Sequence, residues 1–267
     1  MADFRPFDNP ELSLLLAGSF LIWLWVISHW ARGRASLPLA EQGPVPWPAL
    51  AVFATFLVAY FLPEFVTHFA AESIGPIKSI TAVKWNVAAS CLQVAVVVGL
   101  LAIAGPLRAA DFGFSTREWR RDVLSGAGGF LASIAPVFLT MMAVHKLGWR
   151  GREDEHLLLK LLDADHGVTV VAWVALSAVV VAPIAEELIY RVLLQGWTQS
   201  QIAPAKAIVF SSVIFCLSHR LADVLPLAPL ALILGYVYHR RHSFLSVVVL
   251  HAAFNAMNLA LAVLYRS

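Results

Sequence analysis

The sequence predicts an all-α polytopic membrane protein with about eight transmembrane helices and a polar intramembrane cavity. Hydrophobic residues make up 60% of the chain and charged residues 13%, against roughly 25% charged residues in an ordinary soluble domain. The mean hydropathy is +0.75, and apolar runs long enough to span a bilayer recur from end to end. No internal repeat is visible, so residues 1–267 are expected to form a single membrane domain.

Loop-forming residues separate the apolar runs. Three prolines (Pro44, Pro46 and Pro48) lead into the second run, and Gly105-Pro106 follows the third. The longest polar stretch, 145–167, lies between the fourth and fifth runs. Taken in order, the expected spans are 12–30, 48–70, 84–104, 123–144, 168–194, 204–219, 225–239 and 243–264.

The sixth and seventh expected spans are unusually short. At 1.5 Å per residue each covers roughly 22–24 Å, less than the ~30 Å hydrocarbon core. A locally thinned bilayer or helices extended by one turn would account for this. We favour a connection at 219–224 that dips into a wet, protein-lined cavity, because His219 and Arg220 need water or polar partners.

Charge and cysteine content exclude some functions. The net charge is only +2 and the basic residues are scattered through loops, which argues against nucleic-acid binding. Cys91 and Cys216 both fall inside apolar runs, so neither a disulfide nor a cysteine metal site is expected.

A carboxylate pair ends the apolar run 168–185. Glu186 and Glu187 are adjacent, and Arg191 follows four residues after the second. A charged group near the bilayer centre costs roughly 2.5–3.5 kcal/mol on insertion scales, so such groups persist where they line a cavity, pair or do chemistry. Helical spacing places Glu187 and Arg191 on one face, able to pair, while Glu186 points about 100° away.

Two later spans also carry polar groups at depth. His219 ends the sixth span, and His251 and Asn255 lie four residues apart in the eighth. A carboxylate can take a proton from water, a histidine can relay it, and a His–Asn pair can donate to an oxyanion. Each feature alone also fits a structural ion pair or interhelical hydrogen bonds. Their joint occurrence on three spans favours amide hydrolysis.

These residues carry a family resemblance. Glu186-Glu187-Leu188-Ile189-Tyr190-Arg191 resembles the E-E-x-x-[FY]-R motif of the CAAX-protease and bacteriocin-processing (CPBP, or Abi) intramembrane endopeptidases. Phe215–His219 is similar to their F-x-x-x-H motif, and His251–Asn255 to their H-x-x-x-N motif. The resemblance covers roughly 168–262, the expected catalytic core. One departure is Val192, where many members have glycine.

The resemblance implies an eight-helix fold with a water-filled cavity open toward the cytosol, and a type II CAAX prenyl protease-like activity. By position, Glu186 would activate water with the assistance of His219. His251 and Asn255 would form the oxyanion hole, and Glu187 and Arg191 would support the base. The resemblance implies no required cofactor or metal. A zinc-dependent variant is the alternative, with Glu186, His219 and His251 as ligands.

Members of this family act on prenylated CAAX proteins or serve in bacteriocin maturation, immunity and surface-protein processing. The resemblance therefore implies membrane lipids and a membrane-anchored or peptide substrate as partners, and the bacterial cytoplasmic (inner) membrane as the location. The substrate, the membrane orientation and the oligomeric state stay open. Two other functions also remain: a transporter, because buried carboxylates build proton relays, and an inactive immunity or scaffold protein.

Overall fold

A computed structural model describes residues 10–43, 45–74, 80–114, 117–148 and 167–265. Within these ranges all regular structure is helical, as predicted. Most of the predicted polar stretch 145–167 lies outside them. The α-helices are α1 (Pro10–Ala31), α2 (Ala49–Ile74), α3 (Ile80–Ala104), α4 (Trp119–Lys146), α6 (Val168–Ala175), α7 (Ala182–Glu187), α8 (Gly196–Gln201), α9 (Pro204–Leu217), α10 (Val224–Arg241) and α11 (Phe244–Tyr265).

Among the described residues, six helices are long and apolar enough to cross a membrane. They are α1, α2, α3, α4, α11 and the continuous stretch Val168–Gln201, which joins α6, α7 and α8. The multi-pass, all-helical class is therefore confirmed. The other two expected spans are also helical, but α9 has only 14 residues and α10 ends in Arg240 and Arg241. The count of eight spans and the cavity stay predictions.

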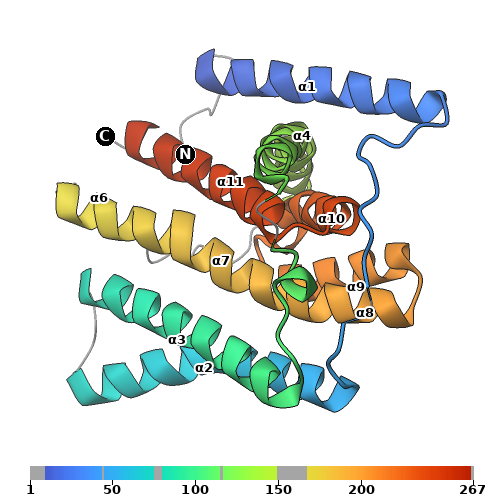
Figure 1. Ribbon diagram of the computed structural model, residues 1–267. Coiled ribbons are helices and arrows are strands. Elements are labelled where there is room, and N and C mark those ends of the chain that lie inside the picture. The colour runs from blue at the N-terminus through green and yellow to red at the C-terminus, as the bar shows by residue number, and fades with distance from the viewer. Residues whose placement is uncertain (1–9, 44, 75–79, 115–116, 149–166, 266–267) are drawn as a thin grey trace.

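The stretch Val168–Gln201 forms a central helix in the molecule (Figure 1). The α2–α3 hairpin packs on one side of it, and α9, α10 and α11 lie on the other. Helix α4 packs against α10 and α11, and α1 lies outermost, against α4. This arrangement puts the middle of the central helix in the core, where every residue of 188–195 is buried.

The central helix is widened on both sides of its glutamates. Leu176–Val181 and Leu188–Gln195 form π-helical turns, and α7 lies between them. Pro183 gives a reason for the first of these turns, because proline has no N–H to donate to the preceding turn. π-Helical turns inside α-helices are frequently found at functional sites.

Two glycines bring α4 close to α11. A Cβ atom on Gly126 would lie 2.5 Å from the carbonyl oxygen of Ser246, and one on Gly129 would lie 2.5 Å from Leu250 Cδ1. Small residues at such crossings let two helix backbones approach closely. Since His251 directly follows Leu250, these glycines help to set where the histidine lies.

Charged residues join α4 to the end of α10. One guanidinium nitrogen of Arg241 lies 2.8 Å from Glu118 Oε2 and 2.8 Å from Asp122 Oδ1. The hydrogen bond from Arg241 lowers the pKa of Glu118 from its ordinary value of 4.5. This cluster connects the end of α10 to the beginning of α4.

Candidate active site

The two adjacent glutamates have different surroundings. Both lie at the end of α7, but Glu187 is fully buried, whereas the Glu186 side chain is 30% exposed. Consecutive helical residues point about 100° apart, which places one carboxylate in the core and leaves the other accessible. Glu186 is therefore the member of the pair whose side chain is partly exposed.

Glu187 binds two partners in the core. Arg191 Nε donates to its Oε2 at 3.1 Å, the pairing that the four-residue spacing predicts. His251 Nδ1 lies 2.7 Å from its Oε1. A carboxylate only accepts, so the Nδ1 of His251 carries a hydrogen when Glu187 is ionised. Glu187 thus fixes the orientation of the His251 ring and aims Nε2 toward Glu186.

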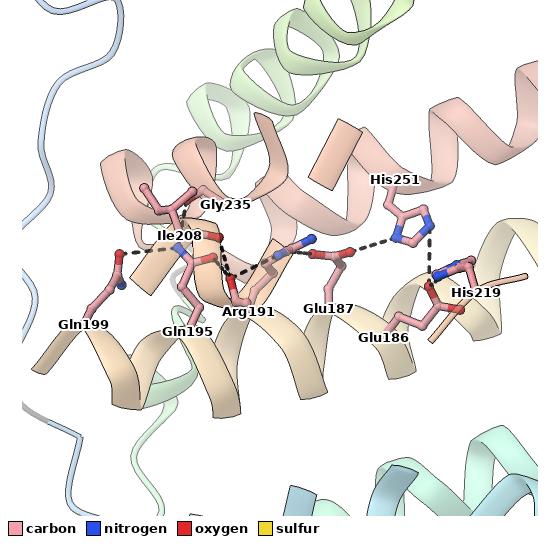
Figure 2. A network of polar contacts seen from close by, with 10 residues as sticks. Glu186, Glu187, Arg191, Gln195, Gln199, Ile208, His219, Gly235 and His251 are labelled. Atoms are coloured by element: carbon pink, nitrogen blue, oxygen red, sulfur yellow. Dashed lines mark hydrogen bonds and ion pairs between the residues drawn. The ribbon is translucent and has the colours of Figure 1, made fainter. Parts of the chain in front are cut away.

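The Glu186 carboxylate faces both histidines (Figure 2). Its Oε2 atom lies 3.7 Å from His251 Nε2 and 3.9 Å from His219 Nε2. These separations exceed a direct hydrogen bond, and polar groups at such distances are commonly bridged by water. The structure therefore brings together side chains from α7, α11 and the turn that follows α9, which are far apart in the sequence.

The backbone of α9 orients His219. Its Nδ1 lies 2.8 Å from the carbonyl oxygen of Phe215. Because a carbonyl can only accept, Nδ1 carries the hydrogen, and Nε2 of the neutral ring is an acceptor directed at Glu186. Phe215 also packs against both imidazoles, with ring centroids 4.6 Å from His219 and 5.8 Å from His251. The first residue of the F-x-x-x-H motif thus supports both histidines.

Asn255 lies one turn after His251 on α11. Its Nδ2 donates to the carbonyl oxygen of Ala178 at 2.8 Å. Ala178 belongs to the first π turn, and its i+5 neighbour is Pro183, which has no N–H to offer. The amide nitrogen carries two hydrogens, so one remains after this bond. The predicted contribution of Asn255 to an oxyanion hole stays a prediction.

The zinc alternative finds no support in the arrangement of the side chains. Among the described residues, no three His, Cys, Asp or Glu side chains are arranged to hold a metal ion. Metal independence stays a prediction.

Sequence reasoning missed two buried residues of the site, Gln195 and Ser211. Arg191 Nη1 lies 3.4 Å from Ser211 Oγ, which lies 3.0 Å from Gln195 Oε1. A signal was available, since Glu187, Arg191 and Gln195 continue one four-residue spacing along the same helix. Ser211 could not be found in this way, because only the packing of α9 brings it to Arg191.

The fold and the site define an integral, multi-pass membrane protein with a partly buried glutamate–histidine centre. Residues 168–257 match the family model described as Type II CAAX prenyl endopeptidase Rce1-like. This match supports a CAAX protease-like (CPBP) family for this part of the chain, and it supports a protease. No curated protein and no solved structure matches the chain.

Proposed function

We propose that the protein is an intramembrane endopeptidase that hydrolyses a peptide bond with water activated by Glu186. The observation that carries this proposal is the position of Glu186 Oε2, 3.7 Å from one imidazole and 3.9 Å from the other. A water molecule between these groups could donate one hydrogen to the carboxylate and the other to a histidine. The family match favours this function over the transporter and scaffold alternatives.

In the proposed reaction, the water oxygen attacks the peptide carbonyl carbon while Glu186 takes one of its protons. The carbonyl oxygen becomes an oxyanion in the tetrahedral intermediate. Glu186 then gives the proton to the departing amine as the C–N bond breaks, so the products are a carboxylic acid and an amine. His219 shares the proton through its Nε2, which the bond to Phe215 leaves as the acceptor.

The remaining residues serve the oxyanion and the geometry. The free hydrogen of the Asn255 amide can donate to the oxyanion, and so can His251 Nε2 when its ring carries both protons. Glu187, held by Arg191, stabilises the doubly protonated form of His251 through the 2.7 Å contact. These roles agree with the positions of the residues in the family motifs.

The proposed substrate is a membrane-associated or lipidated protein or peptide, with a prenylated CAAX protein as one candidate. The catalytic groups lie among apolar helices, so the scissile bond must reach them from the membrane or its surface. We propose the bacterial cytoplasmic (inner) membrane as the location, with its lipids as partners and no nucleic acid.

The test is cleavage of a library of membrane-anchored peptides, prenylated and unprenylated, by the purified protein in liposomes. We expect wild-type cleavage and its loss in Glu186→Ala and His219→Ala, with a smaller loss, roughly 10²–10³-fold, in Asn255→Ala as one oxyanion donor is removed. Wild-type activity that survives Glu186→Ala would end the proposed mechanism.

A chelator series separates the two mechanisms that the family resemblance leaves open. Full activity after exhaustive chelation is the expected result. Inhibition that added zinc reverses would instead establish the metal-dependent variant, with Glu186, His219 and His251 as the ligands to examine.

A further inference from the structure

Arg191 is a buried cation that donates to Glu187, which in turn contacts His251. Its side chain is completely buried, and its guanidinium stacks over the Phe215 ring at 5.1 Å from the centroid. It donates to Glu187 through Nε alone, so the carboxylate lacks the two parallel hydrogen bonds that would orient the guanidinium plane. A second contact is needed to fix the plane of the guanidinium.

Ser211 supplies that second contact. Its Oγ accepts from Arg191 Nη1 at 3.4 Å, while its hydrogen can be donated to Gln195 Oε1 at 3.0 Å or to the Ile208 carbonyl at 3.1 Å. Ser211 is fully buried on α9, opposite the central helix. A buried hydroxyl depends on protein partners for its hydrogen bonds, so the partners of Ser211 determine its orientation.

Gln195 is itself held in place by α10. Its Nε2 donates to the carbonyl oxygen of Gly235 at 2.8 Å, and this orients Oε1 toward Ser211. A Cβ atom on Gly235 would lie 3.0 Å from Gln195 Oε1, so the glycine allows the close approach. Gln199 also contacts Gln195 Nε2, at the longer distance of 3.3 Å. Gln195 therefore contacts both α9, through Ser211, and α10, through Gly235.

These contacts form one continuous series of buried hydrogen bonds, shown in Figure 2 from Gly235 and Gln195 to His251. We propose that Ser211 and Gln195 are positioning residues for the proteolytic centre, setting the plane of Arg191 and through it the Glu187–His251 pair. Neither touches the proposed water or the substrate. This inference rests on the proposed function of Glu186.

The chain offers a matched control for Ser211. Ser212 is the next residue of the same helix and is also buried, but its Oγ has no hydrogen-bond partner among the described residues. Ser211→Ala and Ser212→Ala therefore remove the same atom from similar surroundings, and only the first breaks the series. Gln199→Leu is the control for Gln195→Leu, because Gln195 keeps its hydrogen bond to Gly235 when Gln199 is changed.

The experiment measures kcat and KM for a fluorogenic peptide ending in a farnesylated CAAX sequence, or for the library peptide that the wild type cleaves fastest. We expect kcat to fall about tenfold in Ser211→Ala and Gln195→Leu, with KM within about twofold, because misplacing catalytic groups slows chemistry without weakening binding. The two controls should stay within about twofold of the wild type. Ser211→Thr, which retains the hydroxyl, should recover most of kcat.

Three results would overturn the inference while leaving the proposed function intact. The first is kcat unchanged in both variants although Glu186→Ala is inactive. The second is a rise in KM alone. The third is loss of activity in both variants that follows loss of thermal stability or of a monodisperse elution profile, which would show a purely structural role. An inactive wild type or an active Glu186→Ala would instead reject the proposed function and this inference with it.

Discussion

At the scale of single residues, the two adjacent glutamates are physically different groups. Glu187 is fully buried and binds Arg191 and His251, whereas Glu186 is partly exposed and has no direct hydrogen bond from either imidazole. A charge that is both buried and paired contributes mainly to structure, and an accessible carboxylate between two bases is available for chemistry. Glu187 therefore contributes mainly to structure, and Glu186 is the residue that we propose for catalysis.

This difference predicts unequal effects on stability. Glu187→Ala leaves the buried Arg191 without its carboxylate, and breaking a buried ion pair costs about 3–5 kcal/mol. Glu186→Ala removes a partly exposed group and should cost under ~1 kcal/mol. Thermal unfolding of both variants in detergent measures the difference. Equal melting temperatures would show that Glu187 is not the structural member of the pair.

At the scale of helices, the contact between α4 and α11 positions His251. A Cβ atom on Gly126 would lie 2.5 Å from a backbone oxygen of α11, and backbone cannot move aside as a flexible side chain can. Gly126→Ala should therefore destabilise the protein by about 1–3 kcal/mol and lower kcat as α11 shifts. Thermal unfolding and peptide cleavage measure the two effects.

Gly128 gives the matched control for this contact. It lies two residues further along α4, and a Cβ atom there would meet nothing within 4 Å. Gly128→Ala should leave kcat unchanged and stability equal or slightly higher, because alanine is the better helix former by up to ~1 kcal/mol. If both substitutions had the same effect, the close packing of α4 on α11 would be wrong.

The link between α4 and α10 makes stability depend on pH. Glu118 has a lowered pKa because Arg241 donates a hydrogen bond to it. Its contribution to stability is fully present above the ordinary value of 4.5 and is lost as pH falls through the lowered value in the folded state. The difference in melting temperature between wild type and Glu118→Gln should therefore shrink on acidification from about pH 6 to about pH 3. A difference that is constant over this range would exclude the pairing.

At the scale of the whole molecule, local signals predicted much of the fold. Apolar length located every expected helical region, and four-residue spacing found the Glu187–Arg191 pair. The central helix nevertheless continues to Gln201 instead of ending at 194. The π turns on either side of α7 were also not predicted, because nothing in the apolar pattern marks them. Whether the short α9 and α10 cross the bilayer depends on their neighbours, which no local pattern encodes.

The sequence predicted which residues form the candidate site better than it predicted how they are arranged. The motifs identified the histidines, and the structure brings both to Glu186. The close contact of His251 with Glu187, and the bond from Asn255 to Ala178, depend on how α11 lies against the central helix. Ser211 was missed for the same reason, because its partner is on another helix and the serine itself is unremarkable in an apolar sequence.

The most direct test of the central claim compares cleavage rates of Glu186→Gln, His219→Ala and the variant carrying both substitutions. If both side chains act on one water molecule, Glu186→Gln alone should abolish nearly all activity, and the second substitution should cause little further loss. Losses that multiply in the double variant, or a Glu186→Gln protein that cleaves at the wild-type rate, would contradict the account.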